Sequence, residues 1–158
     1  MTSAVRFAAL LLVAAALLAG CTATPEAPRS ADAMAKEFDS APNAAIVYLY
    51  RSDLAGGTGT ADLWLNGRLI GQTLPKTYFR TAVRAGRNLL AAGGRDSGRL
   101  EFDTRSGEVY YIAIAVDGID EAYLSRFTLT PAATAQRELL RCCTLLENWS
   151  PGQTRWQF

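Results

Sequence analysis

Two stretches of the chain are apolar at almost every position. Residues 44–50 are apolar up to Arg51, and residues 109–116 form a second uninterrupted run. Successive side chains of a strand point to opposite faces of a sheet, so such runs are typical of strands covered on both sides. We therefore predict two central strands.

Other stretches alternate between apolar and polar residues. Residues 99–104 alternate strictly, which predicts a strand with one face in solvent. In a last strand, we expect Tyr123, Phe127 and Leu129 to face inward. The remaining strands are expected at residues 77–84, 88–93 and 123–129.

The dipeptide Asn66-Gly67 predicts a β-hairpin, because both residues accept the positive φ angles of a two-residue type I′ turn. The predicted pairs are Leu65 with Arg68, Trp64 with Leu69, and Leu63 with Ile70. Turn residues recur at short spacing from residue 44 to residue 130. The predicted fold is mainly β: a small antiparallel β-sandwich of about seven or eight strands with one C-terminal α-helix.

The periodicity changes after Thr130, which is expected to cap a helix that starts at Pro131. One apolar face of this helix contains Ala135, Leu139, Cys142 and Leu146. We predict a helix over residues 131–147, followed by an aromatic tail over residues 148–158.

The N-terminal region has the pattern of an export signal. Arg6 precedes an uncharged apolar run over residues 7–19, which spans roughly 20 Å as a helix, short of the roughly 30 Å of a membrane core. Residues 1–20 are therefore predicted to be removed. The sequence Leu18-Ala19-Gly20-Cys21 resembles a lipobox, which implies that Cys21 becomes an N-terminus carrying palmitate and other acyl chains. Thr22 is not the aspartate that retains such lipoproteins at the inner membrane, so the expected location is the outer membrane, facing the periplasm.

Residues 21–43 are rich in Ala, Pro and Ser, a composition that favours a flexible tether. The alternative is a short helix over residues 31–38, capped by Ser30, with Phe38 docked on the domain.

Charge and composition exclude several classes of function. Without residues 1–20, Lys and Arg fall from 16 to 15 and equal the 15 Asp and Glu, which argues against a nucleic-acid partner. The absence of histidine excludes Ser-His-Asp and Cys-His catalysis. The one tight acidic cluster, Asp117, Asp120 and Glu121, lacks EF-hand spacing and is interpreted as a solvated turn. We predict no catalytic residue, no metal and no cofactor.

Cys142 and Cys143 are adjacent, in a compartment where disulfides persist. Neighbouring residues of a helix point in different directions, so a bond between these two would require the helix to break. Four interpretations stay open: buried thiols, an intramolecular disulfide, an intermolecular one, and redox or metal chemistry.

Aromatic residues offer a candidate surface for a ligand or partner, with Arg51, Trp64, Tyr78 and Arg80 as its members. Core packing is the alternative for these aromatics. The leading hypothesis is a non-enzymatic module, anchored to the membrane by its acyl chains, that binds another envelope protein or has a structural role. The alternatives are a peptidoglycan- or glycan-binding module and, third, an enzyme using Asp117, Asp120 and Glu121.

Several short motifs resemble those of a known family. They are Ala45-Ile46-Val47-Tyr48-Leu49-Tyr50-Arg51, Leu65-Asn66-Gly67-Arg68-Leu69-Ile70-Gly71, Tyr78-Phe79, Gly86-Arg87 and Val109-Tyr110-Tyr111. Over residues 38–130 the chain resembles bacterial lipoproteins carrying domain of unknown function 2846, with a likeness to PEGA-type domains in which Ala85 replaces the usual proline. The resemblance implies a small β-sandwich in the periplasm and no established activity.

Overall fold

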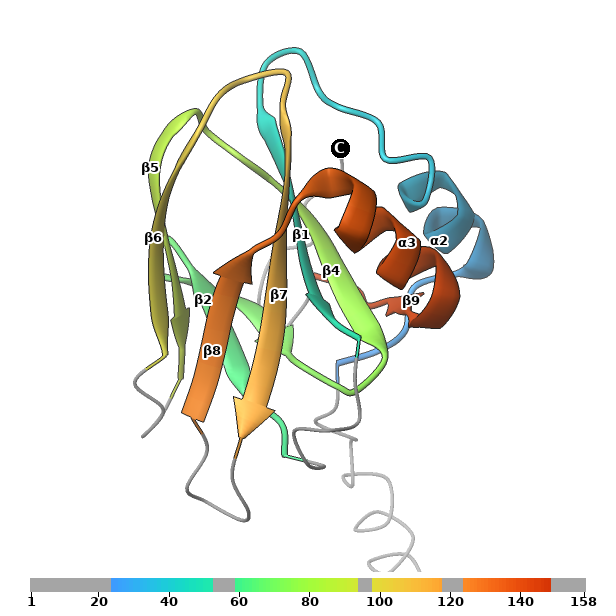
Figure 1. Cartoon of the computed structure of the whole chain (residues 1–158), viewed down its shortest axis with the longest axis vertical. Coiled ribbons are helices and arrows are strands. Elements are labelled where there is room, and N and C mark those ends of the chain that lie inside the picture. Colours follow the sequence, from blue (N-terminus) through green and yellow to red (C-terminus); the bar gives the residue numbers. More distant parts are fainter. Residues whose placement is uncertain (1–23, 53–58, 94–97, 118–123, 149–158) are drawn as a thin grey trace, which may run out of the picture.

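The structure, a computed structural model, describes residues 24–52, 59–93, 98–117 and 124–148 (Figure 1). The strands in these ranges are β1 (Ala45–Arg51), β2 (Asp62–Leu65), β3 (Arg68–Gln72), β4 (Thr77–Val83), β5 (Gly86–Ala92), β6 (Arg99–Thr104), β7 (Val109–Asp117), β8 (Leu124–Leu129) and β9 (Thr144–Leu145). They form a five-stranded sheet in the order β8-β7-β1-β4-β9 and a four-stranded sheet in the order β3-β2-β5-β6. Helices α2 (Arg29–Ala35) and α3 (Ala132–Cys142) complete the described part. This confirms the predicted mainly β fold with a C-terminal helix.

Strand β1 lies at the centre of the five-stranded sheet, between β7 and β4. All seven of its residues are buried, which confirms the prediction from its double-faced apolar pattern. The neighbour β7 is the second predicted central strand, and it pairs with β1 in parallel. The sheets are otherwise antiparallel, apart from the parallel pair of β4 with β9.

The two faces of β1 contribute to two separate hydrophobic clusters. Val47 and Leu49 face the four-stranded sheet and belong to the inner cluster between the sheets, together with Leu63, Phe79 and other buried residues. Tyr48 and Tyr50 point the opposite way, into an outer cluster beneath the helices. The apolar run of β1 is therefore explained by burial on both sides.

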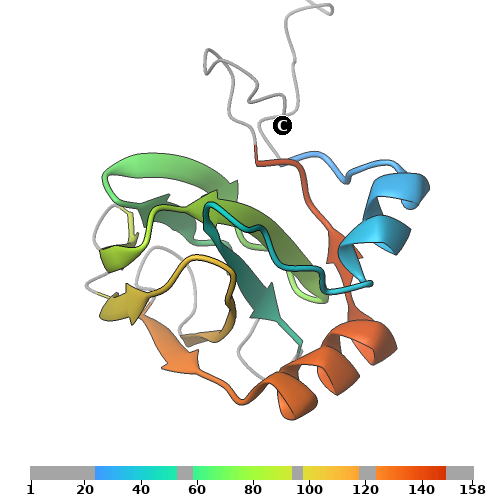
Figure 2. The same cartoon turned by 90° about the horizontal axis from the view of Figure 1, so that it is seen from above.

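Helices α2 and α3 lie side by side on the outer face of the five-stranded sheet, as the view from above shows (Figure 2). The prediction of a flexible tether is wrong for residues 24–43, because this segment contains α2 and packs on the sheet. Of the alternative, the docking of Phe38 is confirmed, whereas the helix spans Arg29–Ala35 instead of residues 31–38. The ring of Phe38 lies 5.5 Å from that of Tyr48 and 6.1 Å from that of Tyr111. Pro28 rather than Ser30 precedes the helix, and no side chain caps α2.

The Asn66-Gly67 turn is confirmed, with φ angles of 53° and 77°. Leu65 pairs with Arg68 and Trp64 with Leu69, as predicted. The third predicted pair is wrong, since a bulge after Leu63 makes this residue pair with Gly71 instead of Ile70. Leu63 and Ile70 nevertheless share the inner cluster. The bulge therefore changes the register without exposing either side chain.

The C-terminal helix ends earlier than predicted, at Cys142 instead of residue 147. Cys143 is extended, and Thr144 and Leu145 form β9 along the edge of β4. The reason is a competing set of backbone hydrogen bonds: the amide of Thr144 donates to Lys76 O at 3.1 Å and that of Leu146 to Tyr78 O at 2.8 Å. Sheet pairing at a free strand edge thus replaces the last turn of the helix.

Two further expectations for this end of the chain are corrected. Pro131 itself occupies the N-cap position of α3, so Thr130 does not cap the helix. Phe127 packs on the inner cluster as expected, whereas Leu129 is 48 % exposed because β8 is the outermost strand of its sheet. Tyr123 lies outside the described residues.

Candidate binding groove

Three tyrosines form a layer on the outer face of the five-stranded sheet. Tyr48, Tyr78 and Tyr111 come from β1, β4 and β7, and the ring of Tyr48 stacks at 5.9 Å on Tyr78 and at 5.2 Å on Tyr111. Their hydroxyl groups reach the helices above them. Tyr48 Oη donates to Ala35 O at 2.5 Å, Tyr78 Oη donates to Asp32 Oδ1 at 2.9 Å, and Tyr111 Oη accepts from Gln136 Nε2 at 2.8 Å. The layer therefore fixes both helices by directional bonds as well as by burial.

Asp32 connects three parts of the fold through its carboxylate. Oδ1 accepts hydrogen bonds from Tyr78 Oη and from the amide of Leu145, each at 2.9 Å, and Oδ2 pairs with Lys36 Nζ at 2.8 Å. Burial by itself would raise the pKa of Asp32, but these bonds and the charge of Lys36 outweigh it, so the pKa lies below its ordinary value. The pKa of Tyr78 is raised by burial and by the neighbouring carboxylate. Asp32 is therefore ionised at neutral pH and holds α2, β4 and β9 together.

The two ends of the described chain run beside each other. The amide of Ala27 donates to Leu145 O at 2.8 Å, and that of Glu147 donates to Pro25 O at 2.9 Å. Thr24 is 7 % exposed, and its Oγ1 accepts from the amide of Gln72 at 2.8 Å. We call residues 24–28 the N-terminal strap, since they bind the edge of one sheet and the end of the other.

A groove of about 650 Å³ lies along this strap. Its walls come from the start of α2, from β4, from the first residues of β3 and from residues 145–148. The apolar part of the lining includes Ala31, Ile70, Val83 and Leu146. A volume of this size is within the range of pockets that bind small molecules or short peptide segments.

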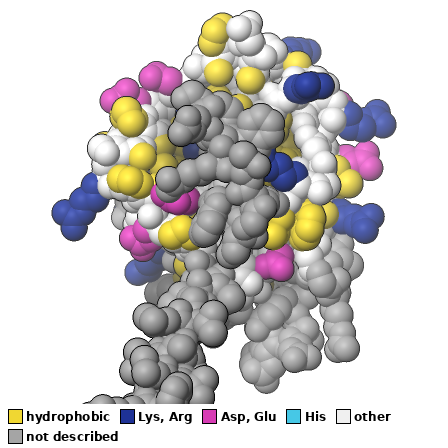
Figure 3. All heavy atoms as spheres, turned by 180° about the vertical axis from the view of Figure 1, so that it is seen from behind, with side chains coloured by type: hydrophobic (Ala, Val, Ile, Leu, Met, Phe, Trp, Pro, Cys, Tyr) yellow, Lys and Arg dark blue, Asp and Glu magenta, His cyan; other side chains and the backbone are white. Residues whose placement is uncertain are grey.

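Arginines give the groove a basic edge. Arg68, Arg80 and Arg84 line it, against one acidic residue, Glu147. In the view from behind, Lys and Arg side chains lie beside exposed hydrophobic ones (Figure 3). The combination of an apolar floor with arginines suits a ligand that is partly apolar and carries negative charge.

Arg80 is held in place by its neighbours. Its Nε donates to Tyr48 Oη at 3.1 Å and its Nη2 to Asp39 O at 3.2 Å. Its backbone oxygen accepts from Asn148 Nδ2 at 2.7 Å, which fixes the last described residue against β4. Arg80 thus links the tyrosine layer to the groove.

The predicted ligand surface of Arg51, Trp64, Tyr78 and Arg80 is not formed. Arg51 is buried between the sheets, where Nη1 donates to Gly59 O at 2.5 Å, because alternation along β1 places it on the inner face. Tyr78 is buried beneath α2, and Trp64, 38 % exposed, belongs to the other sheet. Of the four residues, Arg80 alone lines the groove.

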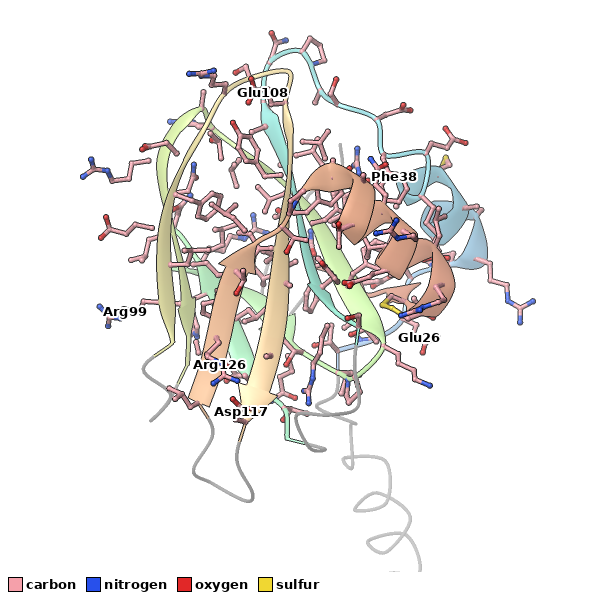
Figure 4. The ribbon with its side chains drawn as sticks, viewed as in Figure 1. Glu26, Phe38, Arg99, Glu108, Asp117 and Arg126 are labelled. Carbon is pink, nitrogen blue, oxygen red and sulfur yellow. A yellow bond between two sulfur atoms is a disulfide. The ribbon has the colours of Figure 1, made fainter. Side chains whose placement is uncertain are left out.

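Cys142 and Cys143 are joined by a disulfide at the end of α3, which Figure 4 shows as a yellow bond. Of the open interpretations, the structure has the intramolecular bond, and Cys143 is also buried. The helix ends at this position and Cys143 is extended. That is the break that a bond between adjacent cysteines requires.

The predicted acidic turn is described only at Asp117, which forms an ion pair with Arg126 at 2.5 Å (Figure 4). Asp120 and Glu121 lie outside the described residues, as do Cys21, the predicted signal segment and the aromatic residues of the tail. Within the described ranges, no group of three His, Cys, Asp or Glu residues is arranged to hold a metal ion. Likewise, no helix in the described part has the length and apolar character to span a bilayer.

Sequence reasoning missed the groove because two of its walls come from segments assigned other roles. Ala27, Pro28 and Ala31 belong to the presumed tether, and residues 145–148 belong to the presumed helix and tail. One signal was present: Ala31 and Ala35 are four residues apart, which is the spacing of a helix face. Small side chains on that face allow α2 to lie close to the sheet.

Comparison with known proteins identifies the family. The model of a family described as "Protein of unknown function (DUF2846)" matches residues 41–122, about half of the chain. The chain belongs to this family. The DUF2846 match covers β1 to β7, so the strap, α2, β8, α3 and β9 lie beyond it.

A Haemophilus influenzae protein described as "Uncharacterized protein" is 28 % identical over 106 residues. The similarity covers 66 % of this chain and 63 % of that protein, less than two thirds of its length. No solved structure matches the chain.

Proposed function

We propose that this DUF2846 protein is a lipid-anchored protein of the bacterial envelope whose β-sandwich is a non-enzymatic interaction module. The groove along the N-terminal strap receives a segment of a partner protein. The observation that carries this proposal is the groove itself, with its apolar floor and the arginines on its edge.

The chemistry of the groove specifies the partner segment. Apolar side chains of the partner contact Ile70, Val83 and Leu146, while an acidic group pairs with Arg84. The groove follows β4 and residues 145–148, which are extended, so a partner segment in an extended conformation matches its course. The proposed partner is therefore an acidic, partly apolar segment of another envelope protein.

We propose the lipid anchor because the sequence around Cys21 resembles a lipobox. We propose the outer membrane as its location because Thr22, and not aspartate, follows this cysteine. A single acyl chain gives marginal binding, whereas a multiply acylated N-terminus holds a protein stably on a membrane. Replacing Cys21 by Ser is expected to abolish palmitate labelling of the protein in cells. Continued labelling of the Cys21→Ser variant would contradict the proposed anchor.

The glycan-binding alternative depended on an exposed aromatic platform. Tyr48, Tyr50 and Tyr78 are buried, and Trp64 is on the outside of the opposite sheet. This arrangement supports the protein-interaction proposal over the glycan one, because sugar rings stack on exposed aromatic faces.

The experiment is photo-crosslinking in cells that express the full-length protein. A photoreactive residue at Thr81, which lines the groove, is compared with one at Glu101, which is exposed on β6 in the other sheet. We expect one discrete envelope protein to be captured from Thr81 and not from Glu101. Capture of peptidoglycan fragments instead of protein would favour the glycan alternative.

A charge reversal tests the basic edge. Arg84→Glu is expected to reduce crosslinking from Thr81, while Arg99→Glu serves as the matched control, because Arg99 is exposed on β6 (Figure 4). Equal crosslinking in both variants would show that the arginine edge does not select the partner.

A further inference from the structure

We infer that the bilayer surface is itself a contact partner of this domain, and that the N-terminal strap holds the domain flush against it. The inference rests on the proposed acylation of Cys21. It goes beyond that proposal, because an anchored domain can equally be held at a distance by a flexible linker.

The strap is attached to the domain from its first described residue. Thr24 is buried, and Gln72 donates its amide hydrogen to Thr24 Oγ1 at 2.8 Å. Glu26 forms an antiparallel bridge with Leu146, flanked by the hydrogen bonds of Ala27 with Leu145 and of Pro25 with Glu147. Main-chain bonds to the edge of a sheet leave the strap no freedom to extend away from the domain without breaking pairs.

The remaining distance to the anchor follows from covalent geometry. Three residue steps separate Cys21 from Thr24, and a fully extended chain spans at most about 3.6 Å for each step. The acylated residue therefore lies within about 11 Å of the domain surface at Thr24. A free linker over residues 21–43 would instead have a root-mean-square length of about 25 Å. The lipid headgroups are therefore close enough to contact the surface of the domain.

The strap also defines which part of the domain lies near the membrane. Figure 4 shows Glu26 in the lower half of the molecule and Glu108 at its upper end, where β7 begins. Strand β7 alone rises by about 26 Å from its first to its last residue. Ala27 and Pro28 line the groove, so the groove is held close to the headgroups and its partner must approach the bilayer.

The experiment measures depth with short-range quenching. The full-length acylated protein is purified from cells and reconstituted into vesicles whose lipids carry a nitroxide on the headgroup. A fluorophore is attached to a cysteine introduced by Glu26→Cys or Glu108→Cys; both positions are exposed, and Cys142 and Cys143 are bonded to each other. We expect strong quenching at position 26 and several-fold weaker quenching at position 108.

A linker variant supplies the control. Twenty Gly and Ser residues inserted between Thr22 and Ala23 are expected to keep the protein on floating vesicles but to remove the quenching at position 26. Suppose that the protein without the insertion floats with the vesicles but shows no quenching at position 26, or equal quenching at positions 26 and 108. That result overturns the strap inference but not the proposed anchor. A protein that does not float overturns the anchor and the inference together.

Discussion

The five-stranded sheet buries both of its faces, but with different chemistry. The inner face contributes aliphatic side chains such as Val47, Leu49 and Ile112 to the cluster between the sheets. The outer face buries tyrosines, and their hydroxyl groups bond to α2 and α3. Both faces gain from removing apolar surface from water, and the outer one adds directional contacts to the two helices.

This difference separates the roles of the two faces. Aliphatic contacts are non-directional and hold the two sheets together by burial and close packing. The tyrosine hydroxyls require particular acceptors and donors, so they fix where α2 and α3 lie, and Asp32 of α2 in turn holds β9 through the amide of Leu145. Since the strap and the groove adjoin these elements, the outer face determines the proposed site and the inner face determines the stability of the sandwich.

The largest effect is expected from the inner face. Replacing Leu49, which is fully buried, by Ala removes apolar contacts and leaves a cavity between the sheets, at a cost of about 3 kcal/mol in the free energy of unfolding. Urea unfolding followed by circular dichroism measures this change. Leu140→Ala on α3 is the control, because Leu140 is 61 % exposed and its loss should change the free energy by less than about 0.5 kcal/mol.

A smaller effect is expected from Asp32 on the outer face. Asp32→Asn keeps the shape but loses the ion pair with Lys36 and weakens the bonds from Tyr78 and Leu145, at a cost of about 2 kcal/mol at pH 7. Because the pKa of Asp32 is lowered in the folded state, the unfolded state binds the proton more readily, and the stabilisation present above pH 4 is lost as the pH falls through the folded pKa.

The pH dependence of the unfolding free energy distinguishes the ionised from the protonated carboxyl group of Asp32. The difference in unfolding free energy between the native protein and Asp32→Asn should shrink between pH 6 and pH 3, measured in urea at each pH. A difference that stays constant over this range would show that the carboxylate charge is not what stabilises the junction.

A single hydroxyl of the tyrosine layer should contribute less. Tyr48→Phe removes the hydrogen bond to Ala35 O and the acceptor for Arg80, with an expected loss of about 1 kcal/mol. Amide hydrogen exchange should report faster opening of α2 than of β1, because the lost bond holds the helix. Equal acceleration in both elements would argue that the hydroxyl stabilises the whole domain and not the helix position.

The smallest effect is expected at Tyr50, which lies next to Tyr48 on the outer face of the sheet. Its buried hydroxyl makes no hydrogen bond of good geometry in the described ranges, and burial, followed by the interaction with the nearby carboxylate of Glu138, raises the pKa of Tyr50 to about 12. Tyr50→Phe should therefore change the unfolding free energy by less than about 0.5 kcal/mol or increase it. A loss as large as that of Tyr48→Phe would mean that the outer face is held by its rings and polar groups collectively and not by particular bonds.

Local patterns in the sequence determined much of the sheet. The apolar run of β1, the alternation of β6 and the Asn66-Gly67 turn each express a rule that acts between neighbouring residues. Such rules are independent of the rest of the chain, so these elements were predicted. The chemistry at Cys21 is of the same local kind, and it stays a prediction.

The tertiary structure alone decided how these elements combine. β4 and β5 follow each other in sequence but join different sheets, and the end of the predicted helix becomes β9 because an edge of β4 is open to pairing. Arg51 and Tyr78, polar enough to suggest a surface, are buried because other segments cover them. The strap and the groove arise in the same way, from contacts between residues 24–28 and residues 145–148. Residues 24–28 and 145–148 are more than a hundred positions apart, and their pairing leaves no periodic pattern in either segment. For this reason the sequence by itself indicated a free tether.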